Sequence, residues 1–287
     1  MPSIWHALVV EVSAKQAEEL AGRFAALAAG IEIRPAGPGH CRLHIFLETI
    51  GGRSPSPDET ASMLRRAGLD PALDVRVEPI EDGRWVERYQ AGLRPFPFGA
   101  RFVIHPDGRA PRDLGDRQTL LLVPGRAFGT GEHPTTQLCA EALERAVIRG
   151  SRWLDVGCGS GILSLVAHHC GAGRVLALDT DEEAVEVARE VFEANRLATA
   201  IDARVGSSGP EAGDGWDGLV ANVHVSFFLD TAESIASRLV PGGHLIASGF
   251  LTEDLGPVAA AMRAAGLSEI GREERAPWAA LVAQREV

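Results

Sequence analysis

The feature that most constrains the fold is the glycine-rich segment Trp153–Leu165, in the middle of the chain. An apolar stretch leads into Gly157, Gly159 and Gly161, and an apolar pattern with helical spacing follows. This order is typical of a strand, a tight turn and a helix N-terminus, the arrangement in which a parallel sheet binds a nucleotide-like ligand. Glycine suits such a turn because it adopts unusual dihedrals and lets a ligand approach the backbone. A dinucleotide fingerprint would place its third glycine at position 162, where this chain has Ile162.

Strand and helix patterns alternate through the C-terminal two thirds of the chain. The pattern predicts strands at 153–156, 174–178, 203–205, 218–221 and 244–248, helices at 161–169, 183–195, 231–239 and 254–265, and a turn at 241–243. Residues 267–270 and 278–284 are predicted to form a closing antiparallel hairpin. The alternation indicates an α/β fold with a Rossmann-like, mostly parallel sheet that is covered by helices on both faces.

The first 80 residues predict a separate and smaller domain. Strand patterns at 4–12, 31–34, 41–47 and 73–80 and helical patterns at 13–29 and 57–67 follow a β-α-β-β-α-β order. That order indicates a ferredoxin-like α/β sandwich, and Ser13 and Gln16 have the spacing of a capping box at the first helix. We expect domains at 1–80 and 96–287 and a linker helix at 81–95. Within the first domain, residues 35–39 are predicted to form a loop. The second domain should begin with strands at 102–105 and 120–123. The first domain is expected to recognise a substrate.

Composition excludes several classes of function. The net charge is -11, with no stripe of Lys and Arg, so a nucleic acid is not expected as the direct substrate and a basic protein is favoured. No apolar run approaches the roughly 18 residues of a membrane span, and the N-terminus lacks the features of a secretory signal. The four cysteines form no metal-type pair. We therefore expect a cytoplasmic protein with reduced thiols and no metal site.

Two polar residues follow predicted strands and should lie at the same edge of the sheet as the glycines. Asp179 follows the second strand, where a carboxylate can accept both hydroxyls of a ribose, and the alternative is a helix cap. We favour Asp179 for the ribose and Asp181 for the cap. Asn222 follows the fourth strand and can offer an amide near the reacting centre, and the alternative is a turn residue with a left-handed backbone.

The segment Ala127–Leu138 lies upstream of the glycine run and contains two glycines before Pro134. One interpretation is a helix start at which Thr135 or Thr136 caps free N–H groups. The other is a loop that closes over a ligand and presents a threonine hydroxyl to it. The pattern alone leaves both interpretations open.

Taken together, the segments Phe128–Gly131, His133–Thr136 and Asp155–Leu163 resemble the bacterial ribosomal protein L11 methyltransferase family. The resemblance spans roughly residues 80–287 and implies a class I methyltransferase domain that uses S-adenosylmethionine. It implies methylation of lysine side chains, and of an α-amine as well, on a ribosomal protein of the large subunit, by a monomeric enzyme. The residues that it places in contact with the cofactor are Phe128, Thr136, Gly157, Gly159, Asp179 and Asn222.

Two departures from the family pattern bear on the substrate more than on the cofactor. Glu132 stands where the family usually has a small or hydroxyl residue, and Val223–Phe228 replaces an aliphatic pair and an alanine. His224 in that segment either faces the target amine or is a polar loop residue, and we favour the loop residue. The alternatives are a methyltransferase for another protein or a small amine, a dehydrogenase, which Ile162 disfavours, and a non-catalytic nucleotide-binding module.

The chemistry implied by the resemblance is direct in-line transfer of a methyl group from a sulfonium to a neutral amine. A lysine amine has a pKa near 10.4 in water and must first lose its proton, which burial and a nearby positive sulfonium both favour. No strong base is then required, and positioning supplies much of the rate. We expect Asn222 to orient either the amine or the methionyl end of the cofactor.

Overall fold

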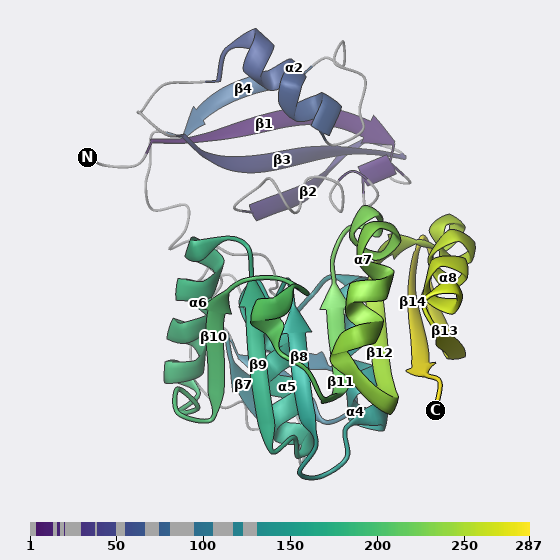
Figure 1. The fold of residues 1–287 in the computed structure, drawn as a ribbon. Helices are drawn as coiled ribbons and strands as arrows, with labels where there is room; N and C mark the ends of the chain where they lie inside the picture. The colour runs from purple at the N-terminus through teal and green to yellow at the C-terminus, as the bar shows by residue number, and fades with distance from the viewer. Residues whose placement is uncertain are drawn as a thin grey trace. The chain divides into compact units, whose positions relative to one another are not determined.

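The computed structural model describes residues 4–13, 16–17, 20, 30–37, 39–49, 55–66, 75–80, 95–105, 117–122 and 131–287. The chain divides into two compact units, Met1–Leu93 and Arg94–Val287, coloured from purple to yellow along the chain in Figure 1. The predicted linker helix at 81–95 falls almost wholly outside the described residues. Among the described residues, no helix is long and apolar enough to cross a membrane, and no group of side chains could hold a metal ion. All four cysteines are free.

The N-terminal unit contains a four-stranded antiparallel sheet with the order β2-β3-β1-β4. Its elements are β1 (Ile4–Ser13), β2 (Gly30–Gly37), β3 (His40–Thr49), α2 (Pro57–Arg66) and β4 (Val75–Ile80). Leu64 of α2 packs on the same cluster as Leu8 and Leu43 of the two central strands, so the helix covers one face. The ferredoxin-like prediction is confirmed, although β2 runs on through part of the predicted loop at 35–39.

The start of the first predicted helix carries the capping box that the sequence indicates. The backbone N–H of Gln16 donates to Ser13 Oγ over 3.3 Å, and the backbone N–H of Ser13 donates to Gln16 Oε1 over 3.2 Å. These reciprocal bonds satisfy donors that a helix N-terminus leaves free. Most of the remainder of the predicted helix, to residue 29, lies outside the described residues.

The C-terminal unit contains a seven-stranded sheet with the order β10-β9-β8-β11-β12-β14-β13. Its strands are β8 (Arg152–Val156), β9 (Arg174–Asp179), β10 (Ile201–Val205), β11 (Trp216–Asn222), β12 (Leu239–Leu251), β13 (Leu267–Arg275) and β14 (Trp278–Arg285). The five strands from β10 to β12 are parallel, and β14 is antiparallel to both of its neighbours. The connections reverse direction between β8 and β11, and ligands of such sheets bind at that point, outside the carboxyl ends of the strands. The predicted sheet and its closing hairpin are confirmed.

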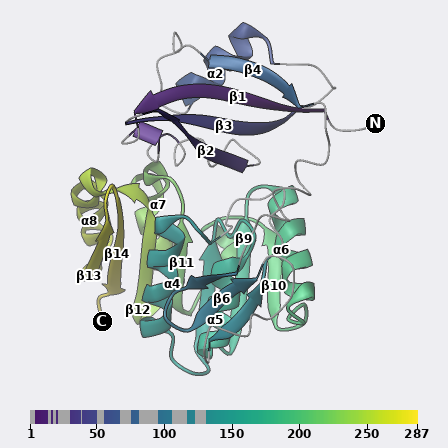
Figure 2. The ribbon, with the colours of Figure 1, turned by 180° about the vertical axis from the view of Figure 1, so that it is seen from behind.

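Helices cover both faces of this sheet (Figures 1 and 2). The helices α4 (Pro134–Ala146), α5 (Ile162–Cys170) and α6 (Glu182–Ala194) pack into the same core cluster as Trp153. The helices α7 (Val225–Arg238) and α8 (Leu255–Ala264) pack with Leu154 and Val156, which point to the opposite face of β8. A small sheet of β5 (Phe96–Phe98), β6 (Phe102–His105) and β7 (Gln118–Leu121) joins the first cluster. The described part of this unit also contains two short 3-10 helices, η1 (Pro210–Ala212) and η2 (Thr252–Asp254).

Two predicted elements differ from the structure. The helix predicted at 231–239 begins at Val225, because His224 caps it and Phe228 is fully buried in its first turns. The turn predicted at 241–243 lies inside β12, whose pairing with β11 jumps from Leu239 to His244. The glycines and proline therefore form an irregularity within a strand and do not end it.

Candidate active site

The glycine turn after β8 has the backbone that its sequence predicts. Gly157, Gly159 and Gly161 all have left-handed dihedrals, with φ of 72°, 51° and 76°. A Cβ atom at Gly157 would lie 2.3 Å from Val223 Cγ1, and one at Gly161 would lie 2.5 Å from the ring of Phe192. Both the dihedrals and the packing therefore require glycine here, and the turn lies at the carboxyl end of the central strand.

Asp179 is bonded to this turn and does not itself cap the helix that follows it. Its Oδ2 accepts the backbone N–H of Gly159 over 2.9 Å, and its Oδ1 accepts that of Asp181 over 3.1 Å. Asp181 is the residue that caps α6, because its Oδ1 accepts the N–H of Glu183 over 2.9 Å. The prediction that Asp181 serves as the cap is confirmed. Asp179 thus joins the ends of β8 and β9 with a carboxylate.

Asn222 and Thr136 form a hydrogen bond across 86 residues of sequence. The side-chain amide Nδ2 of Asn222 donates to Thr136 Oγ1 over 3.1 Å, and Thr136 is 1% exposed. This bond joins the first turn of α4 to the carboxyl end of β11, beside the turn at Gly157, because β11 and β8 are neighbours in the sheet. The sequence predicted both residues for the site, but it gave no indication of their bond.

Asp155 is a buried carboxylate that the sequence reasoning did not assign to the site. It is 1% exposed, its Oδ2 accepts the hydroxyl of Ser164 over 2.7 Å, and its Oδ1 has no hydrogen-bond partner among the residues that the structure describes. Burial raises the pKa of this carboxyl to about 7, the bond from Ser164 opposes the shift, and the charge of Asp179 adds to it. The sequence signal that could have identified Asp155 was an acidic residue inside an apolar strand, two residues before Gly157. An unpartnered buried carboxylate oxygen suits a positively charged ligand.

Comparisons with known proteins agree with this geometry. A family model described as Ribosomal protein L11 methyltransferase (PrmA) matches residues 56–286. The chain belongs to this family. The ribosomal protein L11 methyltransferase of Symbiobacterium thermophilum is 38% identical over 222 residues, which cover 77% of this chain and 72% of that protein. That of Pelotomaculum thermopropionicum is 35% identical over 243 residues, which cover 85% and 79%.

A solved structure supports the same assignment. The crystal structure of ribosomal protein L11 methylase from Lactobacillus delbrueckii subsp. bulgaricus matches with a TM-score of 0.60 at 28% identity. The match covers 68% of this chain and 99% of that one. The predictions of the family and of the class I methyltransferase fold are confirmed. Phe128, the remaining predicted cofactor residue, lies outside the described residues.

In this member of the family, histidines cap two helices at the site. His133 caps α4: its Nδ1 lies 3.4 Å from the backbone N of Thr135 and 2.7 Å from Thr135 Oγ1. The interpretation in which Thr135 or Thr136 is the cap is therefore wrong. His224 caps α7 through its Nδ1, which accepts the backbone N–H of Ser226 over 3.4 Å. His224 is therefore a polar residue at the end of the loop, where it caps α7.

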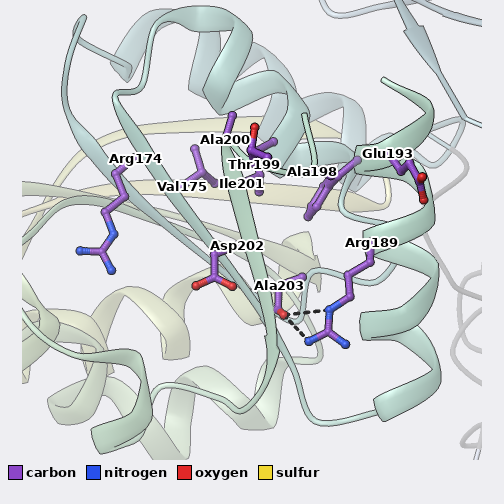
Figure 3. Close-up of a pocket in the computed structure, with 11 residues that line it drawn as sticks. Arg174, Val175, Arg189, Glu193, Ala198, Thr199, Ala200, Ile201, Asp202 and Ala203 are labelled. Atoms are coloured by element: carbon purple, nitrogen blue, oxygen red, sulfur yellow. Dashed lines mark hydrogen bonds between the residues drawn. The ribbon is translucent and has the colours of Figure 1, made fainter. Parts of the chain in front are cut away.

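A groove of about 590 Å³ lies elsewhere on the C-terminal unit (Figure 3). Arg174, which begins β9, lines it, whereas the candidate site lies at the opposite end of that strand. Arg189 donates from Nε and Nη2 to the carbonyl oxygen of Ala203, over 3.2 and 2.7 Å, and the Arg174 guanidinium lies 5.4 Å from the ring centroid of Trp216. Both arginines are thus engaged in the fold, and the groove is separate from the candidate site.

Proposed function

We propose that this chain transfers methyl groups from S-adenosylmethionine to amino groups of ribosomal protein L11. Membership of the family supports the reaction and the substrate protein. The observation that carries the proposal is the meeting of the glycine turn, Asp179 and the Asn222–Thr136 pair at the point where the strand order reverses.

The residues at this point fit S-adenosylmethionine, which carries a sulfonium, an ammonium group and a ribose with two hydroxyls. Asp179 lies where a ribose-binding acid is expected, and we assign it to those hydroxyls. Asp155 Oδ1, which accepts no hydrogen bond from any described residue, is a suitable acceptor for a cationic group. Gly157 and Gly159 leave the backbone open to a ligand, and Phe128 is assigned to the cofactor by resemblance alone.

The methyl group is supplied by the sulfonium of the cofactor when it is bound, and the protein must present a neutral amine. Because Nδ2 of Asn222 donates to Thr136, we assign its Oδ1 to accept an N–H of the amine. Holding an N–H in this way orients the lone pair for in-line attack. Burial of the amine and the nearby positive charge of the cofactor lower the pKa of the ammonium form, so the mechanism needs no strong base.

We further propose that the N-terminal unit recognises the substrate protein and that the enzyme acts as a monomer in the cytoplasm. The assigned residues Thr136, Gly157, Asp179 and Asn222 all belong to the C-terminal unit, which leaves the N-terminal unit free for recognition. A net charge of -11 favours a basic partner. The expected targets are lysine side chains and the α-amine.

Labelled cofactor tests this function directly. Purified protein, labelled S-adenosylmethionine and a mixture of ribosomal proteins are incubated together, and the labelled band is identified. Label on L11 supports the proposal, and label on a different protein refutes the assigned substrate. Cofactor binding by calorimetry without label on any protein would indicate a non-catalytic binding module. Hydrogen exchange with L11 present checks the recognition role, because protection should appear within residues 1–93.

A further inference from the structure

The helix that carries Thr136 begins at an imidazole, whereas helix N-caps are usually Ser, Thr, Asp or Asn. His133 Nδ1 faces both the backbone N and the hydroxyl of Thr135, at 3.4 and 2.7 Å. The ring of His133 also meets the ring of Trp278 edge-on, with 4.7 Å between centroids and 69° between planes. Trp278 is only 7% exposed and begins β14, so the cap is fixed from two sides.

The cap requires a neutral imidazole. A protonated imidazole has two N–H donors and no acceptor, so it cannot accept the N–H of Thr135. Burial lowers the pKa of His133 to about 4, and its neighbour in sequence, Glu132, has a pKa raised by burial. The charged groups of the facing hairpin near α4 are paired: Arg275 with Glu141 over 2.5 Å, and Glu273 with Arg145.

The capped turn is the part of α4 that reaches the site. Thr136 lies one residue beyond the capped Thr135, and its Oγ1 accepts from Asn222. Thr136 is 1% exposed, so it has little room to re-form this bond from a displaced turn. The ion pairs of Glu141 and Arg145 hold the later turns of α4 to the same hairpin. Movement of the first turn would therefore act mainly on the Thr136–Asn222 bond.

We propose that His133 is a positioning residue for methyl transfer: its imidazole fixes the first turn of α4 and so aims the Thr136 hydroxyl at Asn222. The proposal rests on the proposed function, because it takes Thr136 and Asn222 as part of the cofactor site. It adds to that function that His133 acts through Thr136, and that it acts as a hydrogen-bond acceptor.

Three variants test this role by calorimetric titration with S-adenosylmethionine. In His133→Ala the cap is lost, and losing a cap worth about 1 kcal/mol weakens cofactor binding about fivefold. In His133→Asn an acceptor is retained, and binding returns to within about twofold of wild type. Arg145→Ala is the control, because it removes an exposed ion pair at the far end of the same helix and leaves binding unchanged.

A double-mutant cycle shows whether the effect passes through Thr136. In a Thr136→Val background, His133→Ala should weaken binding by less than about twofold, because the positioned hydroxyl is already gone. A fivefold loss that persists in that background overturns the proposal, and so does His133→Ala that binds like wild type. Failure of the wild-type protein to bind the cofactor refutes the proposed function instead. The two failures are therefore distinguishable.

The pH dependence of binding supplies a readout that a purely structural role does not move, and it remains available if His133→Ala does not fold. As the pH falls toward 4, the wild-type cap is lost through protonation, whereas the asparagine cap does not titrate. At a pH equal to its pKa about half of His133 is protonated, so the ratio of the wild-type Kd to that of His133→Asn should rise nearly twofold between pH 6.5 and pH 4. Other titrating groups are common to both proteins and cancel in the ratio. A ratio that stays constant overturns the acceptor role.

Discussion

The buried Asp155 makes the stability of the cofactor-free protein fall as the pH rises. Its pKa in the folded protein is about 7, against an ordinary value of 3.8, so between these values the folded state holds a proton that the unfolded state has released. Stability is therefore greatest below the unfolded pKa and is lost as the pH rises through the folded pKa. The physical cause is the cost of burying a charge whose Oδ1 finds no hydrogen-bond partner in the described part of the chain.

The magnitude follows from the two pKa values. Full ionisation at the folded site costs about 4 kcal/mol, since each pKa unit corresponds to about 1.4 kcal/mol. Part of that cost is already present at pH 5, where the unfolded chain is ionised. The change expected between pH 5 and pH 8.5 is therefore about 2 to 3 kcal/mol.

Urea unfolding at several pH values, for wild type and for Asp155→Asn, isolates this contribution. The asparagine does not titrate, so the difference in unfolding free energy between the two proteins should change by about 2 to 3 kcal/mol over that range. Saturating S-adenosylmethionine should stabilise wild type more at pH 8.5 than at pH 5, because a cationic ligand favours the ionised carboxylate. If the difference in unfolding free energy between wild type and Asp155→Asn does not change with pH, the reasoning about Asp155 is refuted.

Three further variants test individual residues of the site. Asp179→Ala removes the acceptor for the Gly159 N–H as well as the assigned ribose partner, and calorimetry should show cofactor binding weakened by about tenfold or more. Asn222→Ala should lower kcat about 10- to 100-fold with a smaller change in cofactor Kd; unimpaired methyl transfer would show that the assigned role is wrong. Gly161→Ala should destabilise the fold by about 2 to 4 kcal/mol in urea unfolding, because φ is 76° and the new Cβ would lie 2.5 Å from the Phe192 ring. A loss below about 1 kcal/mol would mean that the turn relaxes freely.

The parts of the fold that the sequence predicted are those with a local cause. The glycine turn, the alternation of strands and helices, and the Asp181 cap each follow from a few neighbouring residues. The start of α7 was misplaced because an imidazole at His224 is not a usual N-cap signal. The continuous β12 was missed because Pro241–Gly243 has the composition of a turn, and only pairing with β11 holds it in a strand.

The sequence predicted candidate residues for the site but none of the contacts between them. Strand ends supplied Asp179 and Asn222, whereas the bond from Asn222 to Thr136 depends on how α4 lies in three dimensions. Asp155 was missed because its importance comes from burial and from an unpartnered oxygen, and neither property can be read from residue spacing. The cap at His133 was assigned to the wrong residues for a similar reason, since threonines are the commoner caps.

The charges of the residues that cap the three helices at the site match the groups beside them. Helix N-termini carry a partial positive charge, and those of α4, α6 and α7 lie beside Thr136, Asp179 and Asn222. A carboxylate, Asp181, caps α6, next to the acid assigned to the ribose. The helices beside Asn222 are capped by His133 and His224, and an imidazole cap adds no negative charge. A carboxylate in either place would favour the ammonium form of an incoming amine, which cannot attack the sulfonium methyl. Without a negatively charged cap, the positive helix ends disfavour that form, which is consistent with transfer to a neutral amine without a dedicated base.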